Sequence, residues 1–202
     1  MTPLKQLESI EGIEASKGRD ERVLRENQWV RDINRGDKKA FEAVYKYYYP
    51  QLGSYVLRFT RDRSVTEDVI HNVFCSIWTH RQLLRPSGTL KAYLFTAVRN
   101  QALKHLEQEG RRSGVSFYTL RSIHSERPSP EEDMELLEFE QHLQHALTLL
   151  SERQREIFLL NRESRMSYRE IAEVLDISIK TVETHMRRCL SLLQKRLVGF
   201  KR

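Results

Sequence analysis

Polar side chains able to contact nucleic acid are concentrated in residues 167–190, which read S-Y-R-E-I-A-E-V-L-D-I-S-I-K-T-V-E-T-H-M-R-R-C-L. Apolar residues recur there at intervals of three and four, as on one face of a helix. Basic side chains bind phosphates, and polar side chains can also contact base edges in the major groove. Groups of these kinds stand at the outward positions Lys180, Thr181, Glu183, Thr184, Arg187 and Arg188. The pattern predicts a helix face that contacts DNA.

Two short helices joined by a tight turn are needed to present that face. Ala172 is small enough to let the second helix approach the first closely. Asp176 stands at the turn position where glycine is commonest, and aspartate adopts the left-handed conformation at modest cost. Ser178 is placed to cap the second helix. This is the anatomy of a helix-turn-helix; the alternative is a pair of packed amphipathic helices with a solvated charged face.

The charge of the chain favours a polyanionic partner, either nucleic acid or an anionic membrane. The 202 residues include 34 Lys plus Arg and 28 Asp plus Glu, a formal net charge of +6. Segment 1–106 carries 18 basic and 12 acidic side chains, segment 107–140 carries 4 and 9, and segment 141–202 carries 12 and 7. An acidic stretch therefore separates two basic ones, which predicts two contact modules and a spacer.

Several classes of protein are disfavoured by the motifs that do not occur. The sequence has no P-loop, no H-E-x-x-H, no paired-Cys metal site and no Gly-rich nucleotide turn, so we expect no enzyme, no metal or other cofactor and no small-molecule substrate. Cys75 and Cys189 both lie in apolar helical patterns and are predicted to be buried. No apolar run approaches the ~18 residues of a membrane span, and the N-terminus lacks an apolar signal core. We expect a cytoplasmic protein.

Helical spacing throughout the chain predicts an all-α fold of two small helical domains joined by a flexible linker. Residues 1–20 lack a dense apolar stripe and are expected to form an extension that is flexible or only loosely helical. A helical bundle is predicted over 21–108, a linker over 109–129, and a second helical domain over 130–202. The expected helix starts are Asp37, a capping box from Ser64 to Glu67, a capped start at Ser129 with Pro130, and further starts at Ser151 and Ser167.

Three ordered motifs in the first half resemble region 2 of the extracytoplasmic-function (ECF) sigma factors of the sigma-70 family. They are G-D-K-K-A-F-E-A-V-Y-K-Y-Y-Y-P-Q-L at 36–52, T-E-D-V-I-H-N-V-F-C-S-I-W at 66–78 and L-K-A-Y-L-F-T-A-V-R-N at 90–100. L-S-E-R-Q-R-E-I-F at 150–158 resembles region 4 of that family, and T-V-E-T-H at 181–185 is most similar to the Bacteroidetes type. The resemblance implies an alternative sigma factor that binds core RNA polymerase and directs promoter recognition, DNA melting and transcription initiation.

The resemblance also implies where the partners bind. The exposed face of the third helix would bind the β′ clamp helices of core RNA polymerase through Asp68, His71 and Asn72, although the family usually has Gln where His71 stands. A solvated helix face is the alternative for these residues. The resemblance also implies contact with the β flap of the polymerase, and the linker would run along the active-site cleft and the RNA exit channel. Control by an anti-sigma factor, in the family often an inner-membrane protein, is also implied.

Promoter DNA would bind at two sites. A base flipped from the minus-ten element would be captured by Arg85, Ser87, Thr89, Lys91, Tyr93, Arg99, Asn100 and Lys104, with Tyr93 equally suited to the core. The minus-thirty-five element would be read by Arg169, Ser178, Lys180, Thr181, Glu183, Thr184, Arg187 and Arg188. We expect the loop 81–89 to set which minus-ten base is chosen.

A LuxR-type transcription regulator is the alternative hypothesis, because the helix-turn-helix of such regulators has a similar sequence. Such regulators normally carry an α/β receiver or ligand-sensing domain in front of the helix-turn-helix. Residues 22–107 show no strand pattern. The predicted all-helical first half therefore favours the sigma factor.

Overall fold

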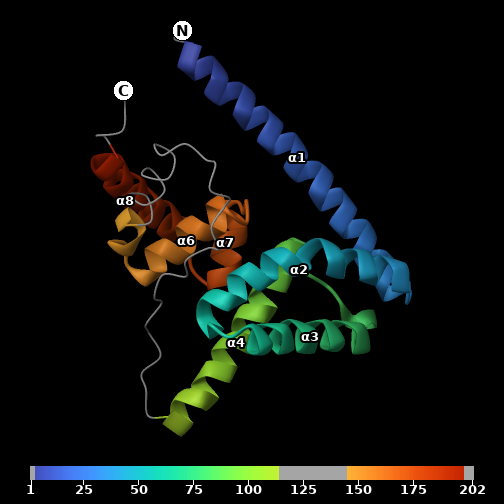
Figure 1. Ribbon diagram of the computed structural model, residues 1–202. Coiled ribbons are helices and arrows are strands. Elements are labelled where there is room, and N and C mark those ends of the chain that lie inside the picture. The colour runs from blue at the N-terminus through green and yellow to red at the C-terminus, as the bar shows by residue number, and fades with distance from the viewer. Residues whose placement is uncertain (1–2, 114–144, 198–202) are drawn as a thin grey trace, which may run out of the picture.

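The fold is helical throughout the part of the chain that the structure describes (Figure 1). The computed structural model describes residues 3–113 and 145–197, and of residues 3–17 and 110–113 it describes the helical backbone alone. No strand occurs in these ranges. The predicted all-α class is thus confirmed.

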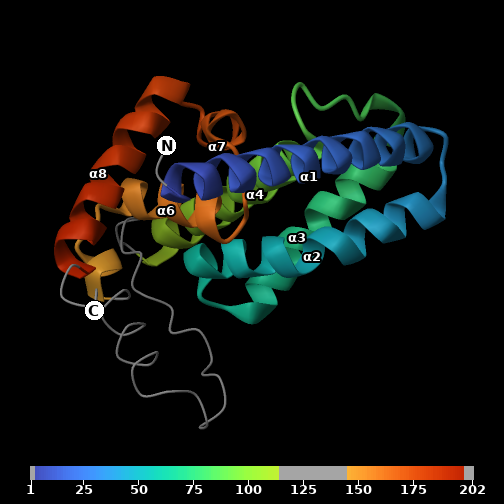
Figure 2. The same cartoon turned by 90° about the horizontal axis from the view of Figure 1, so that it is seen from above.

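The first helical module is a bundle of four α-helices and one short 3-10 turn. It consists of α1 (Pro3–Asn34), α2 (Lys38–Thr60), α3 (Arg63–Thr79), the short 3-10 turn η1 (Arg81–Leu83) and α4 (Leu90–Ser113). α2 packs against both α3 and α4, and the C-terminal part of α1 lies along α2 and α4 (Figures 1 and 2). The side chains that fill this core include Ile33, Tyr48, Leu52, Ile70, Leu94 and Phe95. Their spacing of three and four residues within each helix is why these segments bury one face.

The second module is smaller and contains α6 (Glu152–Arg162), α7 (Tyr168–Leu175) and α8 (Ile179–Leu197). Both α6 and α7 pack against α8 through buried residues that include Ile157, Leu160, Ile171 and Val182. α7 also packs against α4 of the first module. The two modules are therefore in direct contact, so α7 is shared between two packing surfaces.

Local capping chemistry accounts for most of the helix starts. Asp37 accepts hydrogen bonds from the backbone N–H groups of residues 39 and 40, and both Ser151 and Ser167 form complete capping boxes. These three predicted starts are confirmed. The predicted capping box at Ser64 is wrong, because the N-cap of α3 lies two residues earlier, at Asp62, which accepts the hydrogen bond from the N–H of residue 65. Aspartate and serine are comparable N-caps, so the pattern alone did not separate them.

Two predicted boundaries differ from the structure. α1 begins at Pro3, so the expected extension is helical, and residues 3–20 continue the helix that was expected from residue 21. Proline is well suited to a first helical position, and the residues that follow are mostly good helix formers. α4 continues to Ser113, so the first residues of the predicted linker are also helical. The predicted start at Ser129 and Pro130 lies outside the described residues.

A buried carboxylate joins three helices of the first module. Glu26 of α1 is 1% exposed and accepts a hydrogen bond from the phenol of Tyr48, which is fully buried in α2. Its other oxygen accepts from the backbone N–H of Lys91 at 3.2 Å, at the start of α4. Arg22, one turn earlier in α1, approaches the same carboxylate at 3.6 Å. The Glu26 carboxylate therefore fixes where α1, α2 and α4 meet.

Replacing Glu26 is expected to destabilise the fold strongly. Glu26→Ala leaves the Tyr48 hydroxyl and the Lys91 N–H buried without an acceptor, which should cost about 3 kcal/mol in the free energy of unfolding. Glu26→Gln keeps an acceptor and should cost distinctly less. Urea denaturation measures both, with Glu42→Ala as a control that should hardly move the midpoint, because Glu42 is exposed and forms its ion pair with the exposed Lys46 of the same helix. Equal losses for Ala and Gln would contradict this account.

Candidate nucleic-acid interface

The predicted helix-turn-helix is formed by α7 and α8. Asp176 ends α7 in the left-handed conformation with φ 51°, and the N–H of Ile177 donates to the carbonyl of Ala172 at 3.0 Å. Ser178 caps α8 by accepting a hydrogen bond from the N–H of Thr181 at 3.0 Å. Val182 is fully buried on the inner face of α8. The turn chemistry and the inner face are as the sequence predicted.

The outer face of α8 carries the expected polar groups. Lys180, Glu183, Arg187 and Arg188 are exposed, as are Ser178 at the cap and Arg169 on α7. Thr181 and Thr184 are half-buried, and their hydroxyls bond to Ser178 and to the carbonyl of Lys180. All eight residues predicted to read the minus-thirty-five element are thus brought together on one helix-turn-helix.

Two inward residues of α8 are excluded from that face. His185 is half-buried and has an Nδ1 atom without a hydrogen-bond partner among the described residues. Burial, together with Arg188 and Arg153 nearby, lowers its pKa. Cys189 is buried as predicted, and burial raises its thiol pKa to about 11. Both side chains therefore belong to the packing of α8 against α6.

The residues expected to bind core RNA polymerase share one face of α3. Asp68, His71 and Asn72 are all exposed, one turn apart, while the opposite face is buried in the bundle. Cys75 lies on the same exposed face, where its sulfur is 3.3 Å from Nε2 of His71. The predicted burial of Cys75 is wrong, because a thiol at that position of the helix falls outside the apolar stripe. The exposed polar face itself is as expected.

The residues expected to bind the minus-ten element differ in whether they make polar contacts with the second module. Arg85, Asn100 and Lys104 are exposed, and Tyr93 is half-buried against the core of the bundle. Ser87 and Thr89 lie in the loop before α4, and Lys91 and Arg99 lie on α4 itself. These last four, which we call the capture surface, make polar contacts with the second module.

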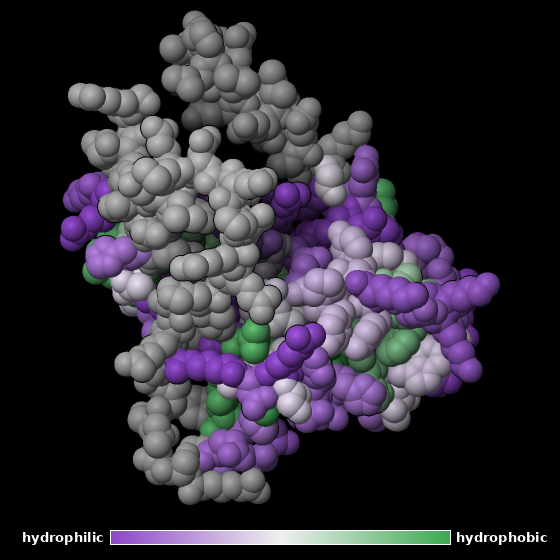
Figure 3. All heavy atoms as spheres, viewed as in Figure 1, coloured by the Kyte–Doolittle hydropathy of each residue, from purple (hydrophilic) through white to green (hydrophobic). Residues whose placement is uncertain are grey.

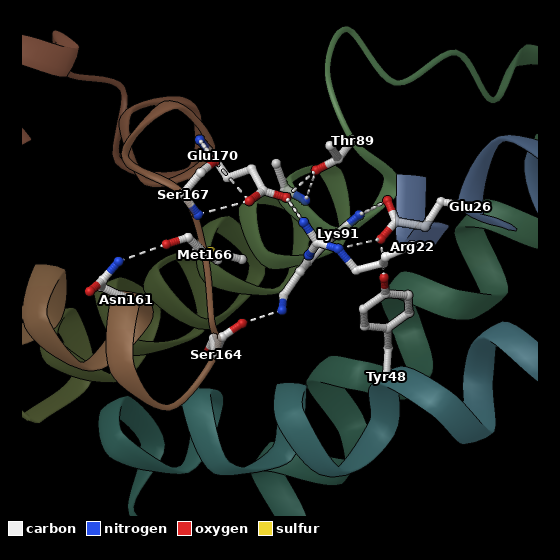
Figure 4. A network of polar contacts seen from close by, with 11 residues as sticks. Arg22, Glu26, Tyr48, Thr89, Lys91, Asn161, Ser164, Met166, Ser167 and Glu170 are labelled. Atoms are coloured by element: carbon white, nitrogen blue, oxygen red, sulfur yellow. Dashed lines mark hydrogen bonds and ion pairs between the residues drawn. The ribbon is translucent and has the colours of Figure 1, made fainter. Parts of the chain in front are cut away.

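Acidic side chains of α6 and α7 meet the capture surface, and Figure 4 shows the contact that Glu170 of α7 makes with Thr89. Thr89 donates to Oε1 of Glu170 at 2.8 Å, and Arg22 of α1 donates to the same oxygen at 2.7 Å. Arg99 donates to Oε1 of Glu156 at 3.1 Å. These contacts between residues distant in the sequence hold the two modules together.

Two further contacts extend this interface. Ser87 in the loop donates to Oε1 of Glu173 at 3.1 Å. The ammonium group of Lys91 donates to the carbonyl of Ser164, in the turn between α6 and α7. Lys91 is 4% exposed, and burial lowers its pKa to about 8, with the charge of Arg22 acting in the same direction.

Sequence reasoning missed the acidic half of this interface. Glu170 completes the capping box of α7, so its place three residues after Ser167 needs no partner outside that helix. Glu156 lies in a short amphipathic helix, and an acidic side chain in such a helix does not by itself indicate a distant partner. No local pattern indicates that these residues face the first module, and only the three-dimensional packing reveals it.

The surface outside these contacts is mostly polar. The face shown in Figure 3 is largely hydrophilic where the structure describes it. Within the same ranges, no helix has the length and apolar character needed to cross a membrane. The described residues also include no group of three or more His, Cys, Asp or Glu side chains that could hold a metal ion.

Both modules match families of known proteins. Residues 44–112 match the family described as Sigma-70 region 2, and residues 140–193 match the family described as Sigma-70, region 4. The chain is 26% identical over 180 residues to the RNA polymerase sigma-H factor of Pseudomonas aeruginosa, covering 85% of this chain and 93% of that protein. It is 25% identical over 176 residues to the ECF RNA polymerase sigma-E factor of Escherichia coli K12, covering 83% and 92%.

Solved structures show the same fold. The sigma factor RpoE, from its co-crystal structure with the anti-sigma factor NepR from Bartonella quintana, is similar with a TM-score of 0.58 and 25% identity, covering 79% of this chain and 97% of the matched chain. The structure of CnrH in complex with the cytosolic domain of CnrY gives a TM-score of 0.58 and 20% identity, covering 88% and 99%. The likeness extends over both helical modules.

The ammonium group of Lys91 should titrate near pH 8, below the ordinary lysine range above 10. Because the folded pKa lies below the unfolded one, the folded state binds fewer protons between these values, and stability should rise as the pH increases through that window. ¹⁵N NMR of the lysine Nζ groups measures the pKa, and Lys91→Gln identifies the signal by removing it. An ordinary pKa would show that Lys91 is not buried against the second module.

Proposed function

This chain belongs to the ECF group of the sigma-70 family, and we propose how its two helical modules share the work of a sigma factor. As a sigma factor it binds core RNA polymerase and directs promoter recognition, DNA melting and transcription initiation. We assign region 2 to α1–α4 and region 4 to the helices after residue 130. Neither matched family is that of the LuxR-type regulators. The protein then acts without catalytic chemistry of its own.

Recognition of the minus-thirty-five element is assigned to the outer face of α8. The observation that carries this assignment is the clean division of that helix, with Val182 and Cys189 fully buried on one side and Lys180, Arg187 and Arg188 exposed on the other. A helix of this kind at the end of a helix-turn-helix fits the major groove. Arg169, exposed at the start of α7, would bind phosphate.

Docking on core RNA polymerase is assigned to the exposed face of α3. Asp68, His71 and Asn72 offer a carboxylate, an imidazole and an amide within one turn of a helix whose other face is held in the bundle. A rigid polar face of this kind suits the β′ clamp helices of the polymerase. Contact with the β flap is assigned to region 4.

Capture of the minus-ten strand is assigned to the loop before α4 and to the exposed side of α4. Arg85, Asn100 and Lys104 are accessible as the chain stands. The hydroxyl, ammonium and guanidinium groups of the capture surface would complete the site by binding phosphates and the edge of a flipped base. The loop 81–89 would then choose the base.

An anti-sigma factor is the partner that we propose for control. Support comes from the structure of the similar Bartonella quintana sigma factor, which was solved in complex with the anti-sigma factor NepR. Since RNA polymerase works in the cytoplasm, the protein would act there. The T-V-E-T-H sequence of α8 supports a place among the Bacteroidetes-type members of the ECF group.

Run-off transcription tests this function directly. Purified core RNA polymerase is supplied with a library of promoter fragments, with and without the protein. Transcripts from discrete start sites only in its presence are expected, and they would give both promoter elements. Duplex DNA binding without core-dependent transcripts would contradict the proposal.

Arg188→Ala should separate promoter recognition from polymerase binding. Loss of one arginine contact to a base or a phosphate should weaken use of a promoter with a minus-thirty-five element by about tenfold, while affinity for core RNA polymerase stays the same. Run-off transcription and fluorescence anisotropy measure the two quantities. Arg31→Ala removes the same charge from the exposed face of α1 and serves as the control. Equal loss of both activities in Arg188→Ala would contradict the assignment.

A further inference from the structure

We propose that three carboxylates of region 4 occupy the capture surface of region 2 in the free protein, so that the two modules must separate before a promoter strand can bind. The carboxylates are those of Glu156, Glu170 and Glu173, which we call the acidic cover. The proposal rests on the proposed function of the capture surface. It adds that the free protein is blocked at the minus-ten site by its own second module.

Glu170 is the most deeply placed member of the acidic cover. It is 3% exposed, and one oxygen accepts from both Thr89 and Arg22 at 2.8 and 2.7 Å. The other oxygen accepts from the backbone N–H and the hydroxyl of Ser167. Burial by itself raises the pKa of Glu170, but the bonds from Ser167 and the charge of Arg22 outweigh it and the pKa is lowered. The group is therefore an anion held among donors.

Glu156 covers the arginine that the family motif marks for DNA. The Glu156 side chain is 9% exposed, and its Oε1 accepts from Arg99 at 3.1 Å and from Tyr55 at 2.9 Å. Its Oε2 accepts from Arg153 of its own helix at 3.2 Å. A guanidinium group engaged in this way has fewer donors left for a phosphate. The Glu156 carboxylate therefore occupies the position at which a DNA phosphate would have to bind Arg99.

Glu173 and the turn before α7 contact the remaining part of the surface, where Lys91 is buried and Ser87 stays exposed. Ser87 donates to Glu173 at 3.1 Å, and the neighbouring Gly88 lies so close to that carboxylate that a Cβ atom there would collide with it. Lys91 donates to the carbonyl of Ser164 and is 4% exposed. A DNA phosphate cannot reach the Lys91 ammonium group in this arrangement.

The donors in these contacts are of the kinds that bind phosphates, and here carboxylates accept their hydrogen bonds. Guanidinium, ammonium and hydroxyl donors bind either anion through the same charge-assisted hydrogen bonds. The faces of α3 and α8, by contrast, remain exposed. The closed form thus leaves the polymerase-docking face and the minus-thirty-five face accessible. Within the minus-ten site it occupies the donors of the capture surface and leaves Arg85, Asn100 and Lys104 exposed.

The first experiment measures closure in the free protein. Nitroxide labels are placed on Cys75, which is exposed on α3, and on a Gln194→Cys substitution, which is exposed on α8; Cys189 is buried. Electron–electron double resonance should give one narrow distance distribution. The cover variant Glu156→Gln/Glu170→Gln/Glu173→Gln should broaden it toward longer distances, as should roughly 1 M salt on the unsubstituted protein, where screening is nearly complete. Glutamine at position 170 still permits the capping box of α7.

The second experiment measures access to the capture surface. A fluorescein-labelled single-stranded DNA of randomised sequence, roughly 15 nucleotides long, should bind the cover variant about tenfold more tightly than the unsubstituted protein, because the open form is no longer a minority. Adding Arg99→Ala to the cover variant should remove the gain. The control Glu21→Gln/Glu42→Gln/Glu67→Gln removes three exposed carboxylates and should leave both the distances and the affinity unchanged.

The outcomes separate this proposal from the proposed function. An unchanged distance distribution in the cover variant, or a changed one without tighter binding of single-stranded DNA, overturns the blocking role. The same gain in the control variant overturns it too, because general charge would then explain the binding. Run-off transcription with core polymerase reports on the sigma function independently, so a protein that initiates transcription but fails these tests loses only the closed state.

Discussion

A carboxylate buried as deeply as that of Glu26 is tolerated only where hydrogen-bond donors surround it, and the arrangement of the molecule follows from meeting that requirement. The donors come from Tyr48 of α2 and from the backbone at the start of α4. Arg22 then lies between Glu26 and Glu170, at 3.6 and 2.7 Å. One guanidinium group therefore couples the core of the first module to the docking of the second. The position of α7 over α4 depends on this chain of alternating charges.

The functional faces are consequences of the same packing. α3 and α8 each bury one stripe completely, and this fixes the rotation of the helix and hence the direction of its polar side chains. Asp68 and Asn72 are presented by the rigidity of the bundle, and Arg187 and Arg188 by the tight turn at Asp176. α4 differs from α3 and α8 because its polar side chains have two alternative binding partners. Its donors serve DNA in the proposed function and carboxylates in the closed molecule.

Local patterns predicted what depends on neighbours in the sequence. The helix-turn-helix, with its left-handed Asp176 and its cap at Ser178, follows from turn chemistry and from a spacing of three and four residues. The exposed face of α3 could be predicted in the same way. For residues 3–20 the sequence left a flexible and a loosely helical form open because they lack an apolar stripe, and the structure shows a continuous helix, which backbone propensity can form without such a stripe. The contacts of Glu156 and Glu170 with the first module could not be predicted, since their partners lie 57 to 148 residues away.

Separation of the modules has to be driven by something that binds the open form better than the closed one. Docking on the α3 face alone does not meet this condition, because Asp68, His71 and Asn72 are equally exposed in the closed molecule. The same holds for a duplex bound only by α8. A partner that holds both modules at once at a greater separation does meet it, and so does a DNA strand that displaces the carboxylates from Thr89 and Arg99. In the proposed closed state, core polymerase that holds both modules apart and promoter DNA that displaces the carboxylates would each supply a driving force that neither exposed face supplies alone.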